Sequence, residues 1–227
     1  KSNYSVNLEA NHINNLGIGS MMTLLKRNDL CYSLNISNNL FEFDFYLDFC
    51  QLINYCKSVS ELDLSGVTIP KPDSITGFLR NQKSIKSLKI ANCGLVNESL
   101  LEFMKIFMLD NSNLISYVDI SGNKITQTKL AMKILTIIKF RKEIETLVMN
   151  DCLDIADAKA PFNLDSLITS KSLVTLKLAG SKCNKDFIIS KCNPEAGLDC
   201  LDLLNVSFVV DCAFVMKLLK LSVNCKQ

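Results

Sequence analysis

Residues 115–125 read ISYVDISGNKI, with apolar side chains at the first, fourth, sixth and eleventh positions and asparagine at the ninth. The same arrangement recurs in VSELDLSGVTI at 59–69, IKSLKIANCGL at 85–95 and LVTLKLAGSKC at 173–183. Weaker copies lie at 3–13, 31–41, 144–154 and 198–208. Eight copies of one frame, LxxLxLxxNxL, predict a repeat protein.

The frame is regular in both content and spacing. The fourth and sixth positions are apolar in all eight copies, and successive copies begin 28, 28, 26, 30, 29, 29 and 25 residues apart. Because side chains alternate along a strand, these two positions point to one side of a short β-strand, which we predict to be the interior. Asp154 departs from the frame at an apolar position, where Leu153 or Ile155 is expected to fill in.

The ninth position is predicted to turn the chain inward. An asparagine amide there satisfies backbone groups that the turn leaves unpaired, and cysteine is a small substitute that tolerates burial. We therefore expect Asn39 and Asn123 to be structural, whereas valine at this position makes no such bond. The position is occupied by Asn11, Asn39, Val67, Cys93, Asn123, Cys152, Ser181 and Val206.

The segments between the frames are predicted to be helical. Apolar side chains recur there at spacings of three and four, with Asn97 and Thr126 as expected N-caps. One strand and one helix per repeat predict an α/β solenoid, or horseshoe, with parallel strands on its concave face and helices on its convex face. The two clearest helical sets are Leu100, Phe103, Met104 and Phe107, and Leu130, Ile134, Leu135 and Ile138.

The copies LDLSGVTI (62–69), LKIANCGLVNESL (88–100) and VDISGNKI (118–125) resemble the ribonuclease-inhibitor-like class of leucine-rich repeats. The resemblance extends over essentially the whole chain. This class includes ribonuclease inhibitor, the Ran GTPase-activating proteins, tropomodulin, the CARMIL actin regulators and the sensor ends of nucleotide-binding immune receptors. The resemblance implies an intracellular binding scaffold, although one fold serves many functions.

We expect a single leucine-rich-repeat domain over 1–227, forming a segment of a longer protein. The first frame begins almost at once, and residues 208–223 are unusually apolar. Further repeats, another domain or a partner should therefore cover both ends, because a solenoid needs atypical end repeats. The expected repeats are 3–30, 31–58, 59–84, 85–114, 115–143, 144–172, 173–197 and 198–227.

The charge balance argues against a nucleic-acid or membrane-surface protein. The chain has 25 basic and 23 acidic residues, for a net charge of +2, which provides no general attraction for polyanions. The most apolar run, 206–223, is interrupted by Asp211, Lys217 and Lys220. No membrane insertion is therefore expected.

The ten cysteines are expected to be reduced thiols rather than disulfides or metal ligands. Disulfide frameworks belong mainly to small secreted domains without a core, and this chain is long enough to build one. Outside the C-terminal third the closest pair is Cys50 and Cys56, and His12 is the only histidine, so no zinc site is expected. A reducing, cytoplasmic location follows.

No residue pattern predicts catalysis or a cofactor. His12 lies in a repeat turn and is interpreted as a solvated histidine, without the partners that a catalytic triad needs. GIG at 17–19 and SGNKIT at 121–126 lack the spacing of a phosphate-binding loop. The chain is therefore predicted not to be an enzyme.

The candidate partner-binding residues flank the buried strand positions and should project from the concave face. Their charges are mixed, with no basic stripe of the kind that binds nucleic acid. The tyrosines are the best expected anchors, although a plain solvated face fits the sequence as well. The candidates are Tyr4, Tyr32, Glu61, Asp63, Lys86, Lys89, Tyr117 and Asp119.

Two other segments offer alternative surfaces. In FEFDFYLDF, residues 41–49, the side chains of Phe43, Phe45 and Tyr46 either plug the solenoid edge or form an aromatic–acidic partner site. The basic helix of the fifth repeat is either a solvated face or a patch for an acidic partner. Its cations are Lys124, Lys129, Lys133, Lys139, Arg141 and Lys142.

Three functions fit the sequence. The first is a scaffold that binds a protein partner through the repeat surface. The second is a GTPase-activating or other regulatory protein of the same repeat type. The third is a structural segment of a cytoskeletal or other large assembly.

Overall fold

The structure, a computed structural model, describes residues 3–25, 30–40, 57–69, 83–105, 114–155, 172–183 and 200–202. Within these ranges the chain forms an eight-stranded sheet whose strands lie in chain order. Every neighbouring pair is parallel. The strands are β1 (Tyr4–Asn7), β2 (Cys31–Asn35), β3 (Glu61–Asp63), β4 (Ser87–Lys89), β5 (Tyr117–Asp119), β6 (Thr146–Val148), β7 (Thr175–Lys177) and β8 (Cys200–Asp202).

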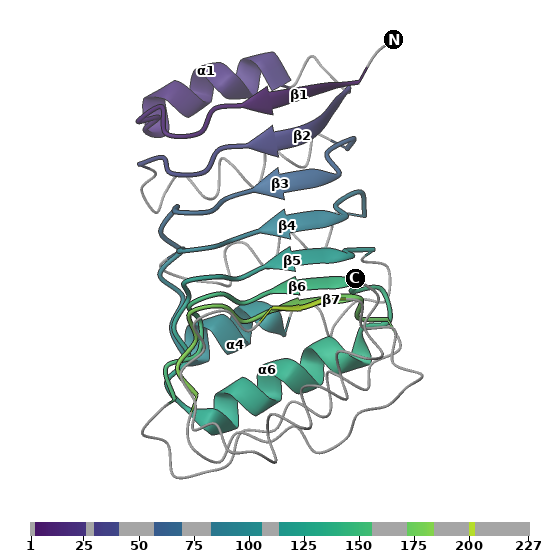
Figure 1. The fold of residues 1–227 in the computed structure, drawn as a ribbon. Coiled ribbons are helices and arrows are strands. Elements are labelled where there is room, and N and C mark those ends of the chain that lie inside the picture. The colour runs from purple at the N-terminus through teal and green to yellow at the C-terminus, as the bar shows by residue number, and fades with distance from the viewer. Residues whose placement is uncertain are drawn as a thin grey trace.

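The strands pair so that each repeat position lies opposite the same position of the next repeat. Leu34 pairs with Leu62, Leu62 with Leu88 and Leu88 with Val118, and all four are fourth-position residues. Figure 1 shows the strands stacked one below another in chain order. A parallel ladder with one strand per repeat is the architecture of a leucine-rich-repeat solenoid, which confirms the predicted fold.

The interior is built from the predicted positions. From the second to the seventh repeat, every fourth- and sixth-position side chain is at most 2% exposed. In the first repeat Val6 and Leu8 are half-buried against the same core. Around the irregular Asp154, both Leu153 and Ile155 are buried while the aspartate is exposed. Both apolar neighbours therefore fill the gap that the aspartate leaves.

The helices return the chain between strands. In the described ranges they are α1 (Asn15–Leu25), α4 (Glu98–Met104) and α6 (Thr128–Phe140), and α4 and α6 contact each other (Figure 1). The predicted apolar faces of α4 and α6 are buried in the same core as the strands. Phe107 lies outside the described residues. Among the helices that the structure describes, none is long and apolar enough to cross a membrane.

Of the two expected N-caps, Asn97 is confirmed by position and Thr126 is wrong. Helix α6 is preceded by Gln127 rather than Thr126, and Asn97 caps α4 by position without a side-chain cap bond. The two side chains instead bind each other across repeats. Asn97 Nδ2 donates to Thr126 Oγ1 at 2.9 Å, and the Thr126 N–H donates to Asn97 Oδ1 at 2.9 Å. An amide engaged with the next repeat is no longer available to its own helix.

Asn39 and Asn123 at the ninth position are structural, as predicted. Asn123 Nδ2 donates to the carbonyl oxygens of Ile90 and Ile120, while its Oδ1 accepts the N–H groups of Cys93 and Leu95, all at 2.8–3.1 Å. Asn39 does the same for the first and second repeats. Each amide is buried and therefore joins two successive turns through hydrogen bonds that water does not replace.

Cysteine and serine replace only part of this network. The Cys152 thiol donates to the Ile120 carbonyl at 2.9 Å, and the Cys93 thiol donates to the Leu64 carbonyl at 3.3 Å. Ser181 binds the Met149 carbonyl at 3.5 Å through its hydroxyl. Val67 is 1% exposed and contributes an apolar side chain to the core in place of a polar one.

The eighth position has a backbone requirement that the sequence analysis did not predict. It has a positive φ in every described turn, from 53° to 73°. Only glycine adopts this left-handed region without cost, although asparagine and aspartate tolerate it. Accordingly, it is occupied by Ala10, Asn38, Gly66, Asn92, Gly122, Asp151 and Gly180.

The buried thiols give a first testable prediction. Cys31, Cys93, Cys152 and Cys183 are free and buried, which agrees with the expected reduced state for these four. Burial raises the pKa of Cys93 and of Cys152 to about 12. At pH 8 these thiols therefore remain protonated and lack the thiolate, which is the nucleophilic form.

We expect Cys93 and Cys152 to resist iodoacetamide at pH 8 in the folded protein. Peptide mass spectrometry after timed labelling would measure this, with the same reaction in urea as the control. Rapid labelling of either cysteine in the native protein would contradict their burial in the core.

Candidate binding surface on the strand face

A hollow of about 450 Å³ lies on the strand face over β1 to β5. Third- and fifth-position side chains form most of its wall, because these positions alternate with the buried fourth and sixth positions. The lining is therefore polar above an apolar floor. It comprises Ser5, Val6, Asn7, Ser33, Leu34, Asn35, Glu61, Leu62, Asp63, Ser87, Lys89 and Tyr117.

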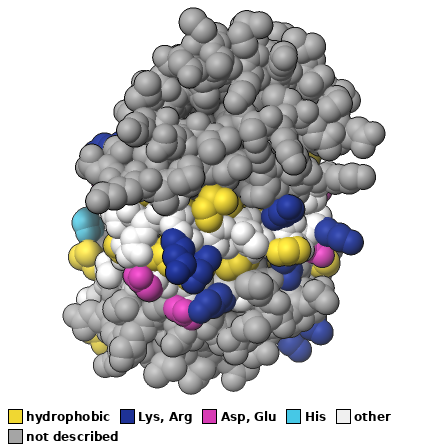
Figure 2. Space-filling model, turned by 90° about the horizontal axis from the view of Figure 1, so that it is seen from below, with side chains coloured by type: hydrophobic (Ala, Val, Ile, Leu, Met, Phe, Trp, Pro, Cys, Tyr) yellow, Lys and Arg dark blue, Asp and Glu magenta, His cyan; other side chains and the backbone are white. Residues whose placement is uncertain are grey.

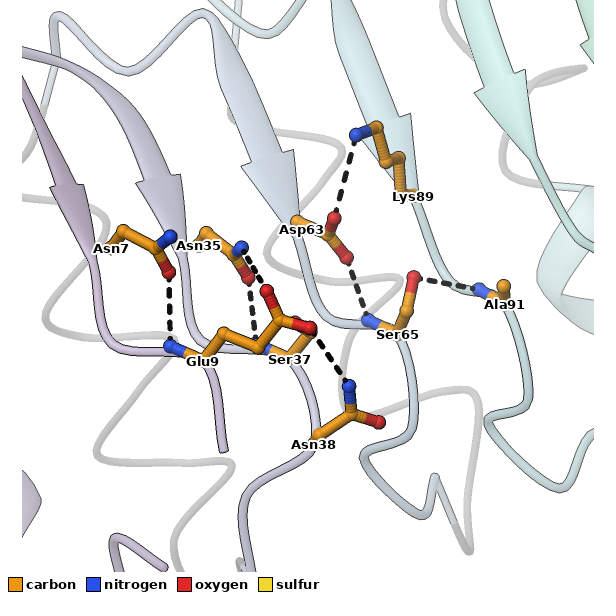
Figure 3. Close-up of polar contacts among 9 residues, drawn as sticks. All are labelled: Asn7, Glu9, Asn35, Ser37, Asn38, Asp63, Ser65, Lys89 and Ala91. Carbon is orange, nitrogen blue, oxygen red and sulfur yellow. Dashed lines mark hydrogen bonds and ion pairs between the residues drawn. The ribbon is translucent and has the colours of Figure 1, made fainter. Parts of the chain in front are cut away.

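The fifth-position side chains also stabilise the ends of the strands. Asp63 Oδ1 accepts the N–H of Ser65 at 3.0 Å, and Asn7 and Asn35 bind the N–H two residues later in the same way (Figure 3). Asp119 repeats the arrangement with Ser121. This local bond holds the start of the turn, as asparagine and aspartate commonly do.

Where the fifth position lacks an acceptor, the preceding repeat supplies one. The repeats with Lys89, Val148 and Lys177 have no carboxylate or amide oxygen there. In the first of these repeats the Ala91 N–H instead donates to Ser65 Oγ at 3.2 Å (Figure 3). In the repeats of Val148 and Lys177, Ser121 Oγ accepts the Asn150 N–H and Asn150 Oδ1 accepts the Ala179 N–H. All seven described turns thus have this N–H satisfied, and Asp63 and Asp119 have a structural role.

The charged residues of the hollow are unequally neutralised. Lys89 Nζ lies 3.5 Å from Asp63 Oδ2 (Figure 3). In the sheet register Lys89 stands between Asp63 and Asp119. Glu61 is exposed, and among the described residues no cation lies within ion-pair distance of it. Glu61, Asp63 and Asp119 thus place three carboxylates on this part of the strand face, and only Asp63 forms an ion pair with Lys89 among the described residues.

Tyr117 forms one wall of the hollow and is half-buried. Burial raises the pKa of its phenol; Asp119 and Asp63 raise it further, while Lys89 lowers it. The phenol is therefore neutral at physiological pH. The ring presents an uncharged aromatic surface beside acidic groups.

The hollow brings together half of the eight candidate partner-binding residues. Glu61, Asp63, Lys89 and Tyr117 line the hollow, and Asp119 follows on the same strand as Tyr117. The other three occupy the second position and do not line it. Tyr32 and Lys86 are exposed, whereas Tyr4 is partly buried against the core, which makes it the weakest anchor.

The sequence analysis did not single out the small residues of the hollow. Ser5, Ser33 and Ser87 occupy the third position in the first, second and fourth repeats, and they leave the space that Glu61 and Tyr117 border. The signal was the alternation of serine with large side chains at one repeat position. It becomes readable only when the strand register is known.

Of the two alternative surfaces, only the basic helix lies among the described residues. Phe43, Phe45 and Tyr46 lie outside the described residues. On α6, Lys129, Lys133 and Lys139 are exposed, but Lys124 donates to the Asp151 carbonyl at 2.8 Å. Arg141, predicted as one of the cations of this basic helix, is only 6% exposed, and its Nε lies 3.4 Å from Glu143 Oε2. The basic face is therefore smaller than the sequence suggests.

The described residues form neither a metal-ligand cluster nor a continuous stripe of like charges. Among the described residues no three His, Cys, Asp or Glu side chains gather in a group suited to a metal ion. His12 is exposed in the first turn, as predicted. Figure 2 shows basic, acidic and hydrophobic side chains side by side on the described part of one face.

The solved structures that resemble this chain include two internalins of Listeria monocytogenes. Internalin C2 is 17% identical, with 90% of this chain and 80% of that chain covered and a TM-score of 0.46. Internalin F is 15% identical with a TM-score of 0.45; 90% of this chain is covered, and the match spans 60% of that chain. A scan against models of protein families and a comparison with curated proteins find no match.

Proposed function

We propose that this protein is a binding scaffold that holds a protein partner on the strand face of its solenoid. The observation that carries the proposal is the polar hollow over β1 to β5. The core beneath it is built from the buried fourth- and sixth-position side chains, and neither Glu61 nor Tyr117 belongs to that core. Side chains that the fold does not use for its core are available for a partner.

The chemistry of the hollow favours binding over catalysis. Its lining contains no histidine, cysteine or other group that pairs a nucleophile with a base. The thiols of Cys93, Cys152 and Cys183 lie in the core, where burial raises their pKa values. We infer that the protein is not an enzyme, acts without a cofactor and belongs to the cytoplasm, where unpaired cysteines persist. We also infer that its repeats are of the ribonuclease-inhibitor-like type.

The proposed face predicts the effect of removing its aromatic anchors. The variant that combines Tyr32→Ala with Tyr117→Ala should bind the partner more weakly. Loss of at least one tyrosine anchor should cost about 1–2 kcal/mol of binding free energy, roughly a five- to thirtyfold loss of affinity. The full chain, immobilised, captures partners from native extract, and titration with the captured partner gives the affinity. Circular dichroism checks that the variant remains folded.

Lys129→Ala with Lys133→Ala is the matched control, because both lysines are exposed on α6. This variant should bind like the unchanged protein. Full binding by the tyrosine variant, with loss in the lysine variant, would place the partner on the basic helix and overturn the proposal. A fluorescent fusion expressed at native level would test the cytoplasmic location.

A further inference from the structure

We propose that the gap above Ser87, between Glu61 and Tyr117, is a subsite for a basic side chain of the partner, with arginine favoured over lysine. This inference rests on the proposed function and adds the chemistry of the segment that is bound. The occupant is an extended peptide segment that places one cation in the hollow.

The register creates the gap. Glu61 lies opposite Ser87, and Ser87 lies opposite Tyr117, so the three side chains form a row across β3, β4 and β5. Neighbouring strands are about 4.8 Å apart, which separates the outer two residues by roughly 10 Å at the backbone. The serine between them is small. A carboxylate and an aromatic ring therefore flank the small Ser87, and the space above the serine admits a planar guanidinium group.

The electrostatics favour a cation in that space. Asp63 is engaged by the Ser65 N–H and by Lys89, and Lys89 is the only cation in the lining. Glu61 is exposed and without an ion-pair partner among the described residues. Asp119 lies beside Tyr117, so the described residues that line or adjoin the hollow carry three carboxylates and one lysine. An acidic ligand would be repelled by the same groups.

The aromatic wall distinguishes arginine from lysine. A guanidinium group stacks on an aromatic face while donating two parallel hydrogen bonds to a carboxylate, whereas an ammonium group makes a single point contact. Glu61 supplies the carboxylate and Tyr117 supplies the ring. Partial burial in the hollow strengthens both contacts relative to a fully exposed pair.

A library of random dodecapeptides displayed on phage is the probe, selected against the immobilised full chain. Selected peptides should contain arginine at one fixed position, with lysine second. Their synthetic forms should bind Glu61→Gln about tenfold more weakly, and 0.5 M NaCl should reduce binding to the unchanged protein. Glu145→Gln is the matched control, since Glu145 is exposed at a second position outside the hollow and should leave affinity unchanged.

The outcomes separate this inference from the proposed function. Peptides that lack a basic residue but lose affinity in Tyr117→Ala would keep the binding face and overturn the arginine subsite. Arginine peptides that bind Glu61→Gln as well as the unchanged protein would also overturn it. Failure to select any peptide would count against both the face and the subsite.

Discussion

Replacing Asn123 by alanine should lower the free energy of unfolding by about 3–5 kcal/mol, one of the largest losses for a single side chain in this fold. The amide makes four hydrogen bonds to backbone groups of two repeats. It is 1% exposed, so water does not replace those bonds. Each unsatisfied buried group costs about 1–3 kcal/mol, and partial relaxation of the turn keeps the total below the sum.

The same position offers its own control. Asn123→Cys should lose about half as much, because the thiols of Cys93 and Cys152 already bind a carbonyl from this position in other repeats. Asn11→Ala should be almost neutral, since Asn11 is exposed and its amide binds only the Glu9 carbonyl. Urea denaturation followed by circular dichroism measures all three variants. Equal stability of the alanine and cysteine variants would show that the bonds of Asn123 are not what stabilises the turn.

The repeat frame predicted the sheet because one periodic pattern fixes the strand, its inward face and its register together. Leu34, Leu62 and Leu88 were assigned the same position, and they lie directly opposite one another. Hydrophobic burial repeated in every copy outweighs any local irregularity, such as that around Asp154. The function of the ninth position was predictable for the same reason, because a buried polar side chain needs partners that only the turn provides.

The finer geometry of the turns was not predictable from one repeat at a time. The Ser65 hydroxyl satisfies the N–H of Ala91, which belongs to the next repeat, because Lys89 has no oxygen to offer. Likewise Asn97 binds Thr126 instead of its own helix. Such bonds depend on which residue the neighbouring repeat places beside the turn. The repeat frame describes one repeat and does not specify these pairs.

The sequence predicted which side chains lie on the strand face but not the hollow that some of them line. The frame identified which side chains leave the strand face, and so it included Glu61, Asp63, Lys89 and Tyr117. Ranking them by residue type also favoured Tyr4, whose ring is partly buried against the core. The hollow itself depends on Ser87 standing between two large neighbours, which is a property of the register and not of residue type.

Replacing Gly122 by alanine should cost about 2–4 kcal/mol, for two separable reasons. Its φ of 70° lies in the left-handed region, where a side chain costs about 1–2 kcal/mol. A Cβ would also overlap Asn92 Oδ1 of the preceding repeat, and it would lie 2.7 Å from Asn92 Cγ. Rotating the amide alone does not relieve the second contact, so the whole Asn92 side chain must move, at a cost of about 1–2 kcal/mol.

Gly94→Ala isolates the first cost, because Gly94 has nearly the same φ of 71° and nothing within 4 Å of an added Cβ. Gly122→Ala should therefore be less stable than Gly94→Ala by the overlap alone. In the background of Asn92→Gly the overlap disappears, and the effect of Gly122→Ala should fall to that of Gly94→Ala. A double-mutant cycle of unfolding free energies measures this coupling, expected to be about 1–2 kcal/mol. If Asn92→Gly left the cost of Gly122→Ala unchanged, the close packing of eighth-position side chains on the glycines of the next repeat would be ruled out.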